Sequence, residues 1–470
     1  MDVKSEIFQK VESYKDEMIA ALSKLISYPS VQGEAAPGAP FGKPVRDCLD
    51  CALGLCRDFG FETKNFEGYA GTASFTSSIG EPELGILAHL DVVPEGTGWI
   101  GDPYTARIED GKIYGRGSID DKGPAVSVIF AMRALKELNL PLKKAFKLIL
   151  GTNEENGSAD LAYYFKKEAP PKYTFTPDGS YPLINIEKGM IRNYFSAKCA
   201  QPMNDRALME LNGGTVINAV PESAYATVSG LSIDVINKAI EKLDCDAKFT
   251  LKDFGGMVRI DCRGRSAHAS TPDMGKNAVT ALISLIASLP LTDDASNKIR
   301  ALSKLFPYGE TNGASLGIEM CDDESGPLTE VLSIISFEAG RLECAMDIRL
   351  PATRSVKDVK DILLPALEKA GFVIDRCGGT EPHLVSSDSP FVKALLKVYE
   401  KVTGEKGECI AIGGGTYVHE IEGGVAFGAE FDGFDYHMHS ANEFIPIDQL
   451  VLNTKMFAIA IYDICNSDEL

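Results

Sequence analysis

Gly85-Ile86-Leu87-Ala88-His89-Leu90-Asp91 is an apolar run that ends in a histidine and an aspartate. A second apolar run, 146–150, leads into Thr152-Asn153-Glu154-Glu155, and Gly117-Ser118-Ile119-Asp120-Asp121-Lys122-Gly123 precedes a predicted helix at 124–138. Open α/β sheets place their ligand sites at the carboxyl ends of strands. Imidazole and carboxylate groups are the ligands that hydrolytic divalent metals use. The sequence therefore predicts an α/β fold with metal-assisted hydrolysis at one edge of its sheet.

The rest of the chain predicts two domains, one inserted in the other. Helices are expected at 6–27, 47–59, 390–403 and 448–465, and they alternate with short apolar strands. From about residue 186 the sequence pattern changes to the apolar–polar alternation of strands, with helices expected at 277–289 and 356–370. We therefore expect an α/β catalytic domain (1–185 and 382–470) whose mixed, mainly parallel sheet is covered by helices. An α+β lid domain (186–381) interrupts it.

Composition excludes several classes of protein. The net charge of −20 argues against nucleic acid and against anionic membrane surfaces, both of which attract basic proteins. No apolar run approaches the roughly 20 residues that span a bilayer. The eleven cysteines are odd in number and scattered, which favours reduced thiols. The first residues lack the basic and apolar regions of a secretory signal, so a cytoplasmic location is expected.

Five residues form a candidate metal site: His89, Asp120, Glu155, Asp178 and His439. Each lies in a motif of its own, the last two in Thr176-Pro177-Asp178-Gly179 and His439-Ser440-Ala441-Asn442-Glu443. In this order and context they resemble the di-zinc metallopeptidase and aminoacylase superfamily. Within it, the chain is most similar to the PepV-like bacterial dipeptidases, a group of Xaa-His dipeptidase or carnosinase type, from Tyr28-Pro29-Ser30-Val31 to the His439 motif.

The resemblance implies a role for each catalytic-domain residue. His89 and Asp178 would hold one zinc ion, Glu155 and His439 the other, and Asp120 would bridge them; manganese or cobalt remains open. Asp91 would orient the His89 imidazole. Glu154 would be the general base that activates a metal-bridging hydroxide. The peptide bond Asp120-Asp121 is expected to be cis.

In the lid, the resemblance assigns substrate contacts. His268 would stabilise the oxyanion, and Asn218, Arg349 and the turn Gly414-Gly415-Thr416 would hold the substrate carboxylate. Because the lid is large enough to supply His268 within one chain, a monomer is expected, although a dimer remains possible. No role is assigned to His383, His419 or His437, nor can preferred dipeptide side chains be predicted.

The expected activity is hydrolysis of dipeptides that have a free N-terminus. The alternative is an N-acyl-amino-acid deacylase or desuccinylase that uses the same metals. A third possibility, a metal-binding protein without catalysis, would be favoured by loss of the base, but Glu154 and all five ligands are present.

Overall fold

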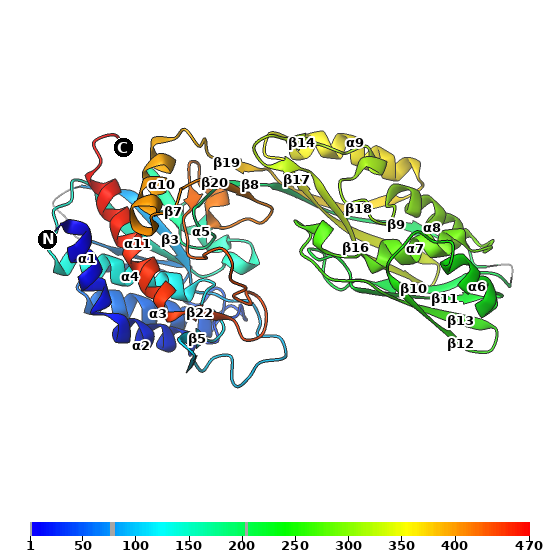
Figure 1. Cartoon of the computed structure of the whole chain (residues 1–470), viewed down its shortest axis with the longest axis horizontal. Coiled ribbons are helices and arrows are strands. Elements are labelled where there is room, and N and C mark those ends of the chain that lie inside the picture. The colour runs from blue at the N-terminus through cyan, green and yellow to red at the C-terminus, as the bar shows by residue number, and fades with distance from the viewer. Residues whose placement is uncertain (1, 76–79, 203–204) are drawn as a thin grey trace. The chain divides into compact units, whose positions relative to one another are not determined.

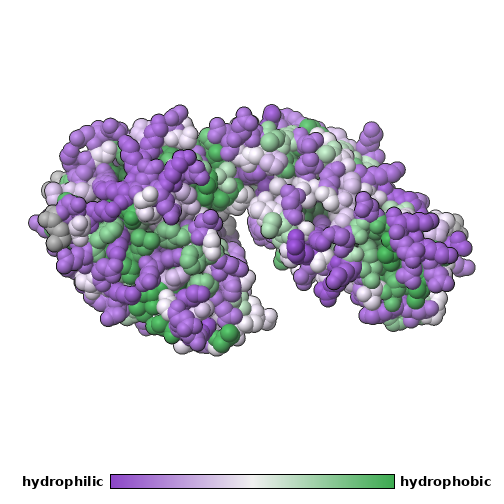
Figure 2. Space-filling view, viewed as in Figure 1, coloured by the Kyte–Doolittle hydropathy of each residue, from purple (hydrophilic) through white to green (hydrophobic). Residues whose placement is uncertain are grey.

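The computed structural model describes residues 2–75, 80–202 and 205–470, and it divides into two compact units (Figure 1). Unit 1 comprises 1–185, 384–410 and 415–470, and unit 2 comprises 186–383 and 411–414. No helix among the described residues is both long and apolar enough to cross a membrane. The viewed face of each unit is mainly hydrophilic, with smaller apolar areas between (Figure 2).

Unit 1 is built on a nine-stranded mixed sheet. Its strand order is β1 (Glu62–Phe66), β2 (Ala70–Ser74), β6 (Ala145–Gly151), β3 (Pro82–His89), β7 (Tyr173–Thr176), β21 (Val425–Ala426), β8 (Leu183–Glu187) and β19 (His383–Leu384), and β20 (Cys409–Ile412) pairs with β8. The pairs β6–β3, β3–β7 and β7–β21 are parallel, whereas β1–β2, β2–β6 and β21–β8 are antiparallel. The parallel ladders are therefore central, and they bring the ends of β3, β6 and β7 to one edge.

Helices and a small second sheet complete unit 1. The helices are α1 (Val3–Glu12), α2 (Lys15–Ile26), α3 (Lys43–Asp58), α4 (Lys122–Glu137), α5 (Ala159–Tyr164), α10 (Pro390–Thr403) and α11 (Ile447–Asn466), with short 3-10 helices η1 (Glu154–Asn156) and η4 (Tyr417–Glu420). A three-stranded sheet contains β22 (Phe444–Pro446), β5 (Lys112–Tyr114) and β4 (Arg107–Glu109). The fold class, a mixed sheet covered by helices, is confirmed.

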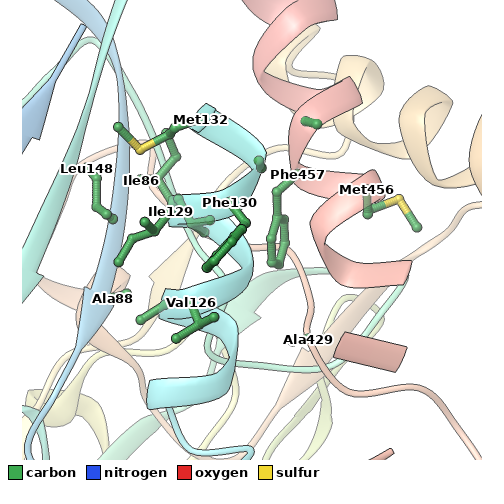
Figure 3. Close-up of a cluster of buried hydrophobic side chains, with 14 of the residues drawn as sticks. Ile86, Ala88, Val126, Ile129, Phe130, Met132, Leu148, Ala429, Met456 and Phe457 are labelled. Carbon is green, nitrogen blue, oxygen red and sulfur yellow. The ribbon is translucent and has the colours of Figure 1, made fainter. Parts of the chain in front are cut away.

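The core of unit 1 holds α4 and α11 together. Phe130 of α4 lies beside Phe457 of α11, and Ile86 of β3 and Leu148 of β6 lie on the strand side of α4 (Figure 3). All four side chains are buried, and each such burial contributes about 1.5–3 kcal/mol. Because α4 begins at Lys122, this packing fixes the position of Asp120 relative to the strand ends.

Unit 2 contains an eight-stranded antiparallel sheet. Its order is β12 (Lys248–Asp253), β13 (Met257–Arg263), β11 (Ser223–Ser229), β10 (Leu208–Gly213), β16 (Thr329–Glu338), β17 (Arg341–Leu350), β9 (Gly189–Lys198) and β18 (Val373–Thr380). The helices are α6 (Ile233–Ile240), α7 (Ala278–Ser288), α8 (Asp294–Leu305) and α9 (Val356–Lys369), together with η2 (Pro272–Met274), η3 (Ala314–Leu316) and the hairpin β14 (Cys321–Asp322) and β15 (Gly326–Pro327).

The helices differ from the predicted ones at several places, among them the N-terminus and residues 294–305. The single helix expected at 6–27 is wrong, because the chain forms α1 and α2 with a break at Ser13, whose hydroxyl donates to the Lys10 carbonyl (2.6 Å). A serine hydroxyl competes in this way with the helical hydrogen bonds. The helix α8 was not predicted, although Asp293 caps it by accepting a hydrogen bond from Ser296 N (3.1 Å).

Candidate metal centre

Three neighbouring parallel strands deliver the first candidate ligands. His89 is the last residue of β3, Glu154 and Glu155 follow β6 in η1, and Asp178 follows β7. In the register of β3 and β6, His89 lies opposite Gly151. These side chains are brought together because parallel strands end at the same edge of a sheet.

Asp120 stands between two groups of candidate ligands. Its Oδ1 is 3.0 Å from His89 Nε2, which is also 3.6 Å from Asp178 Oδ2. Its Oδ2 is 2.8 Å from His439 Nε2, which is 3.3 Å from Glu155 Oε1. Each group of three could hold a metal ion. The two oxygens of Asp120 therefore face two different candidate metal positions, the geometry that a bridging carboxylate requires.

The donor set fits two divalent cations. His89 Nε2 and Glu155 Oε1 are buried, and neither makes a hydrogen bond within the described residues. Leaving a buried polar atom unpaired costs about 1–3 kcal/mol. Two imidazoles with three carboxylates are also the nitrogen and oxygen ligands that zinc and related metals prefer. A metal at each group would satisfy the orphaned atoms.

The pKa values of the cluster show competition for positive charge. Burial lowers the pKa of His89, but Asp120, Asp178 and Asp91 outweigh it and raise that pKa well above its usual value. The nearby carboxylates of Asp120 and Glu155 raise the pKa of His439 to about 11. In the absence of metal, protons thus take the place that cations would occupy.

Asp91 has a wider role than the expected contact with His89. The Nδ1 atom of His89 is 2.9 Å from the backbone oxygen of Asp91 and 3.5 Å from its Oδ1. The carboxylate accepts hydrogen bonds from the backbone N–H groups of Glu154 (3.1 Å) and Glu155 (3.2 Å). Asp91 thus orients the imidazole mainly through its carbonyl, and its side chain holds the two glutamates in place.

Glu443 holds the backbone of Asp120 in place, a role that the sequence did not predict, although Glu443 belongs to the His439 motif. It is fully buried and bonds Arg116 Nη1 (2.8 Å). Its two oxygens also accept the backbone N–H groups of Gly117 (3.0 Å), Ile119 (3.0 Å) and Asp120 (3.3 Å). Arg116 and Glu443 are too far apart in the sequence for their ion pair to be predicted. The position of Glu443, four residues after the candidate ligand His439, could nevertheless have marked it as part of the site.

Asp160 and Tyr417 form a second support that the sequence did not reveal. Asp160 Oδ2 accepts the N–H groups of Thr152 (2.6 Å) and Asn153 (3.0 Å), and the Tyr417 hydroxyl bonds the same oxygen. The Tyr417 ring meets the His89 ring edge-on, with centroids 5.9 Å apart. A Cβ on Gly151 would lie 2.0 Å from the Tyr417 hydroxyl, so only glycine fits there.

Hydrogen bonds of Asn442 hold the loop that carries His439. The peptide bond that follows Asp120 is cis, as predicted. Asn442 Oδ1 accepts a hydrogen bond from Ile100 N (2.9 Å), and Asn442 Nδ2 donates to the Gly98 carbonyl (3.3 Å). The peptide bond Asp120-Asp121 is cis. His437 lies against the Phe444 ring, with centroids 5.9 Å apart, and belongs to neither group of candidate ligands.

Unit 2 gathers most of the residues expected to bind substrate. Ala219 and His268 form an antiparallel bridge, which sets Asn218 close to His268. His268 Nδ1 is 2.7 Å from the Ser270 hydroxyl. Gly413 meets Ser270, because a Cβ there would lie 2.3 Å from the Ser270 Cβ. Asn218, His268 and the Gly413 turn therefore share one region of this unit.

Arg349 is already engaged in this structure. Its Nε and Nη2 atoms donate to the two oxygens of Asp347 (2.6 and 3.1 Å), and its Nη1 donates to the Gly413 carbonyl (2.5 Å). Gly414 belongs to unit 2, whereas Gly415 and Thr416 belong to unit 1, where Thr416 caps η4. The predicted set of substrate contacts is thus divided between the two units.

An α/β unit with two histidine–carboxylate groups sharing one aspartate is typical of dinuclear metallohydrolases. The model of peptidase family M20/M25/M40 matches residues 85–463. The chain belongs to this family, which confirms the resemblance found in the sequence. It is 36% identical over 469 residues to the Beta-Ala-Xaa dipeptidase of Lactobacillus delbrueckii subsp. lactis, covering 98% of each chain.

Two solved structures share the fold at low identity. Human carnosine dipeptidase 1 has a TM-score of 0.61 at 18% identity, with 99% of each chain covered. The di-peptidase Dug1p of Saccharomyces cerevisiae has a TM-score of 0.60 at 16% identity, also with 99% of each chain covered. Both similarities cover nearly the whole chain and therefore include residues of both units.

Proposed function

We propose that this protein is a metal-dependent dipeptidase that hydrolyses the amide bond of dipeptides with a free N-terminus. The observation that carries the proposal is the position of Asp120, whose two oxygens face two separate histidine–carboxylate groups beside Glu154. The 36% identity to a Beta-Ala-Xaa dipeptidase over nearly the whole chain supports the substrate class.

The metal ligands follow from the two groups. His89 and Asp178 would hold one ion, Glu155 and His439 the other, and Asp120 both. We propose zinc as the native metal, with manganese and cobalt as alternatives that the same ligands accept. When bound, the ions supply Lewis acidity that lowers the pKa of water and polarises a carbonyl group.

Glu154 is proposed as the general base. Asp91 fixes its backbone through Glu154 N, and burial raises the pKa of its carboxyl well above the usual value. A carboxylate with a raised pKa is a better proton acceptor near neutral pH. Glu154 would take a proton from the attacking water and give it to the nitrogen of the leaving amino acid.

Unit 2 is proposed to act as the lid. His268 would donate to the oxygen of the tetrahedral intermediate, a contribution typically worth about 3–4 kcal/mol. Asn218 and the turn Gly414-Gly415-Thr416 would hold the C-terminal carboxylate. Arg349 would bind the same carboxylate through the guanidinium N–H groups that Asp347 does not use, or by releasing Asp347 and binding the substrate in its place.

The alternative is an N-acyl-amino-acid deacylase or desuccinylase with the same metal ligands. Zinc-loaded protein should be assayed with alanyl-alanine, β-alanyl-histidine and N-acetyl-alanyl-alanine, and a chelated sample serves as control. Cleavage of only the unblocked peptides, abolished by chelation, is the expected result. Cleavage of only the acetylated peptide would establish the deacylase, and no cleavage with two metals bound would refute both.

A monomer in the cytoplasm completes the proposal. All eleven cysteines are free, which fits a reducing compartment. The large segment 186–383 contains His268 and would supply it to the metal site of the same chain, without a partner subunit. Elution from a sizing column at the mass of a dimer would contradict the proposed monomer.

A further inference from the structure

A cavity of about 320 Å³ lies within unit 2, at the base of the segment that carries His268. Arg265 and Lys276 close this segment, 265–276, by two backbone hydrogen bonds of 2.9 and 2.8 Å, and both residues line the cavity. Glu330 of β16 lines it as well. Binding sites for small molecules begin at about 300 Å³, so the cavity is large enough for a small ligand.

Most charged side chains in the cavity wall already have partners. Asp246 pairs with Lys276 and Tyr308, Asp273 accepts a hydrogen bond from Thr311 (2.6 Å), and Glu310 accepts one from Ser315 N (2.7 Å). Each of these interactions lies within unit 2. The two other charged side chains of the wall are Glu330 and Arg265.

Glu330 is an unpartnered carboxyl in a nearly closed environment. Its side chain is 4% exposed, and its Oε1 has no hydrogen-bond partner in the described part of the chain. Burial, with a contribution from Glu310, raises the pKa of Glu330 well above its usual value. A buried carboxyl without a partner is costly, and a cationic ligand is one means of satisfying it.

Arg265 offers the opposite charge at the same cavity. It is exposed, and its guanidinium makes no hydrogen bond or ion pair within residues 2–75, 80–202 and 205–470. A planar guanidinium binds a carboxylate through two parallel hydrogen bonds. Val220, Val331 and Leu332 add apolar side chains to the wall of the same cavity.

We propose that this cavity binds a free α-amino acid with an aliphatic side chain. The ammonium group would donate to Glu330, the carboxylate would accept from Arg265, and the side chain would lie against the apolar wall. A zwitterion matches both unpartnered groups, because its ammonium group would stabilise Glu330 as an ionised carboxylate while its carboxylate pairs with Arg265. A simple anion or cation would leave one of the two groups unused.

The bound amino acid would contact the segment 265–276 directly. Because free amino acids are the products of a dipeptidase, the cavity would couple product concentration to the segment that carries His268. This coupling rests on the proposed function, whereas the binding itself does not. The two are therefore tested separately.

The binding is tested by titrating the full-length, metal-free protein with L-leucine in a calorimeter. The probes L-leucinamide, which lacks the carboxylate, and N-acetyl-L-leucine, which lacks the ammonium, serve for comparison. We expect leucine to bind and each single-charge analogue to bind at least tenfold more weakly. Equal binding of N-acetyl-leucine, or no binding of leucine at millimolar concentration, would overturn the proposal.

Substitutions assign the site. E330Q and R265M should each weaken leucine binding at least tenfold. The matched control is R263M, since Arg263 is exposed on the neighbouring strand and does not line this cavity. Arg265 is exposed, so R265M should fold even if E330Q does not. Unchanged binding in R265M would place leucine elsewhere, and hydrolysis of dipeptides by the zinc-loaded wild type tests the proposed function independently.

Discussion

The substitution E443Q provides a demanding test of how the position of Asp120 is maintained. Glu443 Oε1 accepts the N–H groups of Ile119 and Asp120, and Oε2 accepts Arg116 and Gly117 N. Glutamine has the same shape, but one end of its amide is a donor. In either orientation that NH₂ group faces two other donors.

The magnitude follows from this count. Two donors lose their acceptor, and each buried unsatisfied donor costs about 1–3 kcal/mol. Removing one charge of a buried ion pair is independently expected to cost about 3–5 kcal/mol. We therefore expect E443Q to lower the free energy of unfolding of unit 1 by about 3–5 kcal/mol. Since Asp120 loses a backbone anchor, metal affinity should fall about 10–100-fold.

The single tryptophan gives a local signal for this measurement. The Arg116 guanidinium carbon lies 5.2 Å from the centre of the Trp99 ring, so Trp99 fluorescence during urea unfolding reports on this part of unit 1. The matched control is E17Q, which removes an exposed partner of Arg133 (2.7 Å) and should cost less than about 1 kcal/mol. An unfolding free energy of E443Q within about 1 kcal/mol of wild type, together with unchanged metal affinity, would refute the anchoring role of Glu443. That threshold is the cost of the least costly unsatisfied donor.

Three further results are expected. E154Q should bind zinc with the same stoichiometry as wild type but lose about 10²–10⁴-fold in kcat on an unblocked dipeptide, and normal turnover would exclude Glu154 as the base. Y417F removes the hydroxyl that bonds Asp160 and should cost about 1–3 kcal/mol in urea unfolding with two metals still bound; a loss of metal without a loss of stability would contradict this structural role. Burial raises the pKa of Glu330 in the folded state above its unfolded value of about 4.3. Between these two pKa values only the unfolded chain releases the proton, so the free energy of unfolding falls as pH rises. E330Q should therefore gain in stability relative to wild type from pH 5 to pH 8, as measured by urea unfolding followed by circular dichroism. A difference in free energy of unfolding that does not change with pH would show that Glu330 ionises alike in the folded and unfolded states.

Several parts of the fold could be predicted because they depend on local patterns. Helix α9 begins where Ser355 and Asp358 form a capping box, and α4 and β6 lie within two residues of their predicted bounds. The break between α1 and α2 could not be predicted, since the apolar spacing continues through Ser13 and Tyr14. There the Tyr14 hydroxyl reaches Glu137 (2.9 Å), a contact that only the folded chain makes.

The candidate ligands could be named from sequence because each stands at the end of an apolar strand or in a distinct motif. The grouping of His89 with Asp178, and of Glu155 with His439, came from resemblance, and its assignment to metal remains a prediction. Among the residues that support these ligands, only Asp91 was predicted, and only as a partner of His89. Asp91 binds the backbone 63 residues away, and Asp160 meets Tyr417 across 257 residues. No local pattern marks such partners.

The sequence by itself determined an α/β chain with an inserted α+β segment, the chemistry of the ligand set and the membership of a peptidase family. Periodicity and strand ends carry that information, because they depend on neighbours along the chain. Only the tertiary structure decided that Glu443 anchors Asp120 and that Arg349 is held by Asp347. It also decided that Glu330 lines a cavity, where its Oε1 has no hydrogen-bond partner among the described residues. Burial and hydrogen bonding depend on which distant segments meet, and that is settled by packing.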